Sequence, residues 1–141
     1  MISDLQGQIW LDGTFCDWKD AKIHILTHTL HYGTGVFEGV RAYETEQGPA
    51  IFRLQDHTSR LFKSAELIGM NIPYSKTRTY GSQCESVKIN KLKNAYKRAF
   101  MFLWKQREWV LEQIILKCML HFSSWDWGAY LGEDKIKKES R

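Results

Sequence analysis

Alternation of apolar and polar residues is the first pattern along the chain. Residues 7–21, GQIWLDGTFCDWKDA, hold two short apolar runs separated by Asp12-Gly13. An Asp-Gly pair between such runs favours a two-residue hairpin turn, because both residues tolerate positive φ. This segment is therefore predicted to form a tight β-hairpin.

A second alternating segment covers residues 35–54, GVFEGVRAYETEQGPAIFRL, and turns at Gly48-Pro49. The two sides of the alternation are Val36, Val40 and Ala42 on one, and Phe37, Arg41 and Tyr43 on the other. A period of two residues predicts strands with one buried face. The Gly-Pro pair marks the turn between them.

From about Leu54 to Met70 the apolar period becomes helical. The residues that recur at this spacing are Leu61, Ala65 and Ile68, with Phe62 alongside. Asp56 lies near the expected start, and Asn71 and Pro73 are expected to end the helix. Strands followed by a helix packed on their sheet predict an α+β fold.

Composition indicates in which cellular compartment the chain lies. Hydrophobic residues make up 43% of it, but no run approaches the roughly 18 apolar residues of a membrane span. The N-terminus, MISDLQGQIW, has neither a basic leader nor an apolar stretch. We therefore expect no membrane partner and no secretory signal, and a cytoplasmic or organelle-matrix protein, of which we favour the cytoplasmic one.

Cysteine count and charge argue against a disulfide-linked, a metal-binding and a nucleic-acid-binding protein. Cys16, Cys84 and Cys118 are odd in number and lack CxxC spacing, so we expect free thiols and no metal site. The net charge is +4, but Lys and Arg lie mostly after position 76 and are interleaved with acids. That pattern is typical of a solvated surface, and no aromatic-basic motif accompanies it, so we expect no nucleic-acid partner.

Two features could be structural or functional on spacing alone. Arg60 falls on the flank of the expected helix away from Leu61, which suits either a surface arginine or a clamp for phosphate or carboxylate. Gly33, Gly35 and Gly39 permit close backbone approach, which suits a pocket wall or an ordinary hairpin. Spacing does not choose between these interpretations.

Several segments together resemble the N-terminal small domain of branched-chain amino-acid aminotransferases, which are pyridoxal-phosphate enzymes of fold type IV. The segments are HYGTGVFEGVRAYET, IFRLQDHTSRLFKSAELIGM, QCESVKINKLKNAY and SWDWGAYLGEDKIKK, in family order. The resemblance implies an antiparallel sheet with packed helices, a homo-oligomer, and a large domain absent from these 141 residues. D-amino-acid aminotransferase and aminodeoxychorismate lyase share the fold, but GVFEGVRAYET with WDWGAYLG favours the branched-chain type.

The resemblance also implies residue roles. Arg60 resembles the arginine that holds the cofactor phosphate, and we expect it to point into a cleft without an acidic partner. The residues that resemble the wall of the pocket for the branched side chain are Phe37, Tyr96, Trp127 and Tyr130. Arg98 and Tyr32 resemble the residues that receive the distal carboxylate of glutamate, with Tyr32 reaching across from a second subunit. For Trp127 and Tyr130, an aromatic pair in the core is the alternative.

The reaction implied by the resemblance moves an amino group from leucine, isoleucine or valine to 2-oxoglutarate through pyridoxal phosphate, in a ping-pong cycle. The family's Schiff-base lysine lies in the large domain, and Lys135, Lys137 and Lys138 do not match it. We therefore expect part of a binding site, no catalytic residue, and no activity from this chain alone. The alternative is a non-catalytic, truncated small-domain dimerisation module or a pseudogene product.

Two segments depart from the family pattern. Residues 76–83, KTRTYGSQ, interrupt the start of an expected amphipathic helix with Thr, Gly and Ser. Residues 104–122, WKQREWVLEQIILKCMLHF, stand where the family has a glycine-containing loop and a strand. Their apolar residues favour a helix over 104–120. Such conflict between local and global signals argues against stable folding.

The genetic code offers one explanation. Residues 76–82 can be encoded so that a frame begun one nucleotide later spells K-Q-E-L-M-E-A, a good helix start that joins QCESVKIN. Residues 107–119 can be encoded so that a frame begun two nucleotides in spells G-M-G-L-R-A-D-N-L-K-V-H, which resembles the family's loop and strand. Paired frame slips or a decayed copy would explain both segments, and real divergence in two loops is the alternative.

Overall fold

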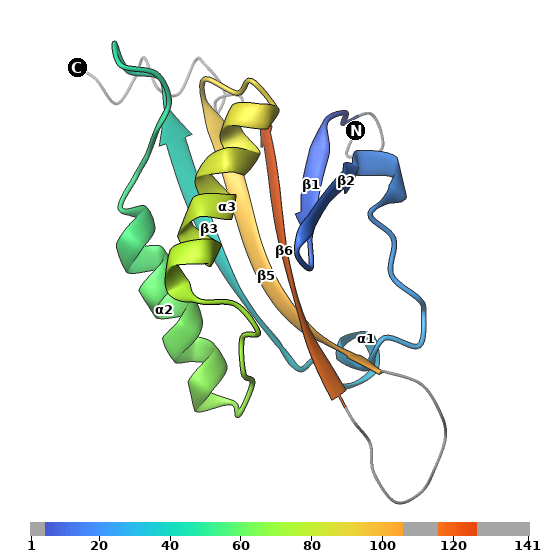
Figure 1. Cartoon of the computed structure of the whole chain (residues 1–141). Coiled ribbons are helices and arrows are strands. Elements are labelled where there is room, and N and C mark those ends of the chain that lie inside the picture. Colours follow the sequence, from blue (N-terminus) through green and yellow to red (C-terminus); the bar gives the residue numbers. More distant parts are fainter. Residues whose placement is uncertain (1–4, 106–115, 127–141) are drawn as a thin grey trace, which may run out of the picture.

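The computed structural model describes residues 5–105 and 116–126, which form an antiparallel sheet with two long helices on one face (Figure 1). The strands are β1 (Gln8–Leu11), β2 (Thr14–Asp17), β3 (Gly35–Tyr43), β4 (Ala50–Ile51), β5 (Ala95–Lys105) and β6 (Leu116–Asp126). They are ordered β2-β1-β6-β5-β3-β4. The helices are α1 (His28–Tyr32), α2 (Leu54–Leu67) and α3 (Lys76–Ile89), with a short 3-10 turn at Trp18–Asp20. The predicted α+β class is confirmed.

Both predicted hairpins form. β1 pairs with β2 through a turn in which Asp12 and Gly13 have φ of 46° and 108°, the positive values that such a turn requires. β3 pairs with β4 after the turn at Gly48, where φ is 102°. β3 also pairs along its length with β5, and β5 with β6, so long-range pairing completes the sheet.

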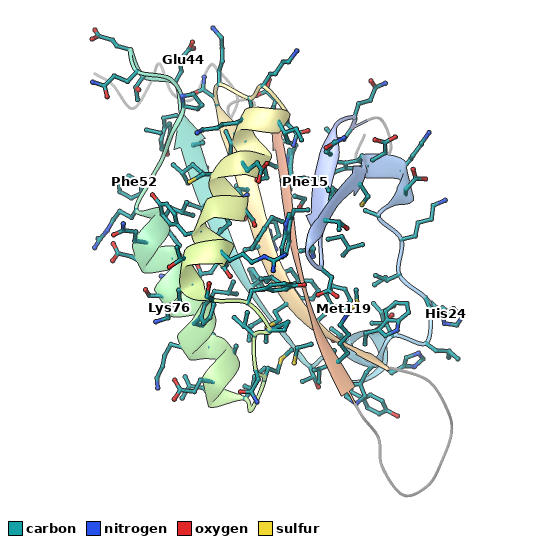
Figure 2. All side chains as sticks on the ribbon, in the orientation of Figure 1. Phe15, His24, Glu44, Phe52, Lys76 and Met119 are labelled. Carbon is teal, nitrogen blue, oxygen red and sulfur yellow. The ribbon has the colours of Figure 1, made fainter. Side chains whose placement is uncertain are left out.

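One face of the sheet packs against α2 and α3. In β3 the residues on that face are Val36, Glu38, Val40 and Ala42, and the register places Met101, Ala99, Lys97 and Ala95 of β5 opposite them. The core between helices and sheet contains Trp10, Leu61, Ala65, Met101, Leu120 and Phe122. Figure 2 shows side chains in the space between the helices and the strands.

Helix α2 ends earlier than the sequence predicts. Its last residue is Leu67, and Gly69 follows in the left-handed conformation with φ of 71°. Met70 N–H donates to the Ala65 carbonyl at 2.9 Å and Gly69 N–H to the Glu66 carbonyl at 3.0 Å. This is a Schellman motif, in which a glycine ends the helix. Asn71 and Pro73 come after it.

Helix α3 forms despite the Thr, Gly and Ser residues of KTRTYGSQ. Ser75 caps it, because its Oγ accepts from the Arg78 backbone N–H at 3.2 Å. The face it buries is mostly polar: Thr79, Ser82, Gln83, Ser86 and Val87. The Thr79 hydroxyl has no hydrogen-bond partner among the described residues. The expected interruption of this helix is therefore wrong, because α3 runs unbroken over Lys76–Ile89.

The expected helix over 104–120 is wrong where the structure describes it. Trp104 and Lys105 end β5, and β6 begins at Leu116. The alternation of Leu116, Cys118 and Leu120 fits a strand, and pairing with both β5 and β1 fixes it there. Residues 106–115 lie outside the described part of the chain.

Cys16, Cys84 and Cys118 are free thiols, as predicted. None of the helices in 5–105 and 116–126 has the length and apolar character needed to cross a bilayer.

A lysine lies at the centre of the core. Lys97 has no exposed surface, and its Nζ donates to the hydroxyls of Ser86 and Ser124 and lies 5.1 Å from the Phe122 ring centroid. Within the described residues no carboxylate pairs with it. Burial removes the ammonium from water and lowers the pKa of Lys97 to about 7.

Replacing Lys97 should therefore change the pH dependence of stability. Between about pH 7 and about pH 10 the unfolded chain keeps a proton that native Lys97 has lost. The free energy of unfolding should then rise with pH by up to about 1.4 kcal/mol per unit. Lys97→Met should remove this slope and raise stability most below pH 7. Urea unfolding across this range measures it, with Lys88→Met on the exposed side of α3 as the control. Equal slopes in parent and Lys97→Met would contradict the assignment.

Candidate functional site

The face of the sheet opposite α2 and α3 carries the candidate site, and is called the open face here. It is defined by Phe37, Gly39 and Arg41 of β3, Tyr96 and Arg98 of β5, and His121 and Trp125 of β6, which the register places on one side. Phe37 is 60% exposed. Because side chains alternate along a strand, the pairing that builds the core also gathers these residues on the other face.

Arg98 lies against two aromatic rings. Its guanidinium carbon lies 4.7 Å from the Phe37 ring centroid and 5.4 Å from that of Tyr96. Its Nη2 donates to the Tyr96 hydroxyl at 3.0 Å. No Asp or Glu within 5–105 and 116–126 forms an ion pair with it, and its buried Nε has no partner there. The structure thus presents a positive charge on an aromatic surface without a counter-charge among these residues.

Aromatic side chains extend this surface from β5 to β6. Tyr96 and Trp125 lie directly opposite each other, with ring centroids 5.1 Å apart. His121 lies beside Phe100, with ring centroids 5.6 Å apart. Burial, together with the charges of Lys97 and Arg98, lowers the pKa of His121 to about 4. At neutral pH His121 is therefore uncharged and adds no second positive charge to that of Arg98.

Arg60 does have an acidic partner, so that part of the prediction is wrong. Its Nε and Nη2 donate to the two carboxylate oxygens of Glu38, each at 2.6 Å. His57 Nδ1 lies 2.8 Å from the same carboxylate. Burial alone would raise the pKa of Glu38, but hydrogen bonds from Arg60 and His57 outweigh it and hold that pKa below its usual value. Glu38 is thus an anion that orients the guanidinium.

The Arg60 side chain nevertheless remains accessible. It is 66% exposed, and no hydrogen bond to the described residues uses its Nη1. The two Nη1 protons can therefore donate to an anion while Glu38 fixes the opposite edge. A phosphate group, which accepts such paired donors, fits this geometry.

The remaining predicted residues lie elsewhere. Tyr32 is in α1 and is 72% exposed, with ring contacts to His28 at 4.4 Å and His31 at 6.3 Å between centroids. Trp127 and Tyr130 lie outside the described residues. Among the predicted residues, the structure brings together Phe37, Tyr96 and Arg98.

Sequence reasoning missed two parts of this arrangement. Glu38 lies on the buried side of the β3 alternation, among Val36, Val40 and Ala42. An acid at such a position requires a partner, so the pattern held a signal for the Arg60 pair. Trp125 had no such signal, because its neighbour on β5 is set by long-range pairing. The described residues hold no cluster of His, Cys, Asp or Glu suited to a metal ion.

Comparison with known proteins identifies relatives. Residues 35–139 match the family described as amino-transferase class IV. The chain is 47% identical over 137 residues to the branched-chain-amino-acid aminotransferase of Pseudomonas aeruginosa, covering 97% of this chain and 44% of that protein. It is 33% identical over 138 residues to the protein of the same name from Escherichia coli K12, covering 98% and 45%. The chain thus spans less than half the length of these relatives.

Solved structures of branched-chain aminotransferases have the same fold as this chain over the matched part. The crystal structure of the Escherichia coli branched-chain amino acid aminotransferase superposes with a TM-score of 0.83 at 33% identity, over 92% of this chain and 43% of that chain. The branched-chain aminotransferase of the thermophilic archaeon Thermoproteus uzoniensis, solved with norvaline, gives 0.79 at 33% identity, over 89% and 42%. The predicted architecture, a small domain with an antiparallel sheet and packed helices, is confirmed.

Proposed function

Because the chain belongs to the class IV aminotransferases, we propose that it forms the substrate-binding small domain of a branched-chain-amino-acid aminotransferase. The proposed reaction moves an amino group between leucine, isoleucine or valine and 2-oxoglutarate. Pyridoxal phosphate, when bound, supplies the electron sink that amino transfer requires. The names of the relatives support this substrate class.

Arg98 is the observation that carries the proposal. A guanidinium without a carboxylate partner among the described residues, clamped by Phe37 and Tyr96, suits a ligand that brings its own carboxylate. The distal carboxylate of glutamate or 2-oxoglutarate is such a group. A pair of N–H donors on the guanidinium would fix its orientation.

The aromatic surface around Arg98 suits the other substrates. Phe37, Tyr96 and Trp125 present ring faces to which a branched apolar side chain can pack. Each buried methylene contributes about 0.8 kcal/mol, and a rigid aromatic wall rejects bulkier groups by size. One surface can therefore accept an apolar side chain in one half of the cycle and a carboxylate in the other. Trp127 and Tyr130 remain proposed members of this wall.

Arg60 is the proposed cofactor-phosphate residue. Glu38 orients its guanidinium, and the exposed Nη1 edge is available to phosphate. Glu38 and Phe37 are neighbours in β3, so one strand supports the proposed phosphate contact and the proposed substrate wall.

A second copy of the chain is the proposed partner for the segment around α1. Its exposed apolar residues are Ile25, Leu26, Leu30 and Tyr32. A group of large apolar side chains in contact with water is typical of a covered interface. The proposed role of Tyr32 in the neighbouring subunit's site belongs to this part of the proposal.

The function is tested by a chimera in which this chain replaces the matching part of the Pseudomonas aeruginosa enzyme. We expect amino transfer from leucine to 2-oxoglutarate by the chimera, and none from the 141-residue chain alone. Phe37→Ala should reduce transfer from leucine, isoleucine and valine by about tenfold or more, because apolar contacts are lost, with cofactor absorbance unchanged. A folded, cofactor-loaded chimera that accepts none of these three substrates would contradict the proposal.

Arg60→Ala in the same chimera should weaken cofactor retention by roughly 1.5 to 3 kcal/mol, the scale of hydrogen bonds to a charged group. Arg60→Lys should recover only part, because an ammonium lacks the paired donors. Dialysis followed by absorbance of the retained pyridoxal phosphate measures this. Arg53→Ala, which removes an exposed arginine paired with Asp56, is the matched control. If Arg60→Ala retains cofactor as tightly as the parent, the phosphate assignment fails.

We also propose that residues 76–82 result from a frame slip. The alternative frame, K-Q-E-L-M-E-A, would place Leu at position 79 and Ala at position 82, the two buried positions of this segment. It would place charged or polar residues at the exposed positions 76, 77, 78 and 81, and Met at position 80, which is also exposed. The burial pattern of α3 therefore supports this frame. For residues 104–122 the described part is regular strand, so the structure adds no support for a second slip.

The frame-slip proposal makes two linked predictions. The gene should show one extra or missing base near codon 76, compensated a few codons later. Thr79→Val, which removes the unpaired buried hydroxyl, should raise the free energy of unfolding by about 1 kcal/mol or more. Thr77→Val on the exposed side of α3 is the control. An intact frame confirmed from messenger RNA would refute the slip, and an unchanged stability would refute its structural support.

A further inference from the structure

We propose that Gly39 is a positioning residue. Because it has no side chain, Tyr96 can lie across β3 and hold Arg98 against the rings of Tyr96 and Phe37. This inference rests on the proposed function only for the identity of what Arg98 binds.

Gly39 has no room for a side chain, whereas its backbone conformation would allow one. Gly39 lies within β3 directly opposite Arg98 and is absent from the residues with positive φ. A Cβ added at Gly39 would lie 2.2 Å from the Tyr96 hydroxyl oxygen and 3.0 Å from its Cζ. Real Cβ atoms essentially never approach another heavy atom this closely. A glycine inside a strand often marks such a close approach.

The displaced group would be the one that fixes Arg98. The Tyr96 hydroxyl accepts from Arg98 Nη2, and the Tyr96 ring contacts Trp125 on the other side. A methyl group at Gly39 would push the hydroxyl away from the guanidinium and open the clamp on one side. Phe37 would remain as the other ring contact.

Other glycines show that this arrangement is specific. A Cβ at Gly35, also in β3, would meet the Phe100 ring at 3.0 Å and the Met101 carbonyl oxygen at 3.1 Å, and not the Phe37 or Tyr96 ring that lies against Arg98. A Cβ at Gly81, in α3, would meet nothing within 4 Å. Among these three, Gly39 is the position where a side chain would reach the arginine clamp.

Gly39 would thereby control the direction in which Arg98 presents its remaining N–H donors. A guanidinium held by two ring contacts and by the Tyr96 hydroxyl presents its remaining N–H donors in a fixed direction, so the carboxylate of a ligand must lie at a set distance from the rest of that ligand. Gly39 would thus favour dicarboxylates of one length over monocarboxylates. It would act through Tyr96 and touch no substrate itself.

The test is a double-mutant cycle on the 141-residue chain, read by the Arg98 Nε–H signal in nuclear magnetic resonance and assigned by its loss in Arg98→Lys. Ring faces shift this signal and burial slows its hydrogen exchange. We expect Gly39→Ala to move it toward the position of an exposed arginine and to speed its exchange. In a Tyr96→Ala background, Gly39→Ala should add no further change, because the displaced group is gone.

Gly81→Ala should leave the Arg98 signal unchanged. If Gly39→Ala fails to fold, Gly39→Ala with Tyr96→Ala should restore folding, and failure of that rescue would overturn the inference. An unchanged Arg98 signal in Gly39→Ala, or an equal change in both backgrounds, would also overturn it.

A titration with glutarate separates this inference from the proposed function. The parent chain should bind glutarate about tenfold more tightly than Gly39→Ala does, the loss expected for a weakened hydrogen bond to a charged group. If the parent does not bind glutarate while the Arg98 signal responds as expected, the carboxylate role of Arg98 fails and the positioning role of Gly39 stands.

Discussion

The register between β3 and β5 is the constraint on which the rest of the structure depends. With Gly39 opposite Arg98, the pairing puts Val40 opposite Lys97 in the core and Phe37 beside Arg98 on the open face. A slip of one residue in either strand would exchange the faces of every side chain in it. The core, the aromatic surface and the position of Glu38 on the helix-facing side of β3 therefore all follow from this register.

Polar groups in the core set the limit on stability. The helix-facing side of the sheet buries Lys97 among Ser86 and Ser124, and α3 adds the unpaired hydroxyl of Thr79. An unpaired buried hydroxyl costs about 1 to 3 kcal/mol, against a total stability of about 5 to 15 kcal/mol for an ordinary domain. Against these costs stands the main apolar cluster, which joins β1, α2, β5 and β6 through residues such as Trp10, Leu61, Met101 and Phe122.

Sequence patterns predicted the parts of the fold that depend on local spacing. The Asp12-Gly13 hairpin, the alternation of β3 and the helical period of α2 all appear in the structure. The strand at Leu116–Asp126 was missed because its apolar residues continue a longer run, and only pairing with β5 and β1 decides between strand and helix. For the site, family resemblance pointed to Phe37, Tyr96 and Arg98, but the Glu38 partner of Arg60 emerges only from the spatial packing of β3 on α2.

Backbone proton contacts across the β3–β5 pair test the central claim most directly. In nuclear Overhauser spectra of the isotopically labelled chain, Gly39 should show its cross-strand contacts with Arg98, and Val40 with Lys97. These contacts would place Phe37, Tyr96 and Arg98 on one face. Contacts of Gly39 centred on Lys97 or Ala99 instead would put Arg98 on the helix side and contradict the account of both the core and the site.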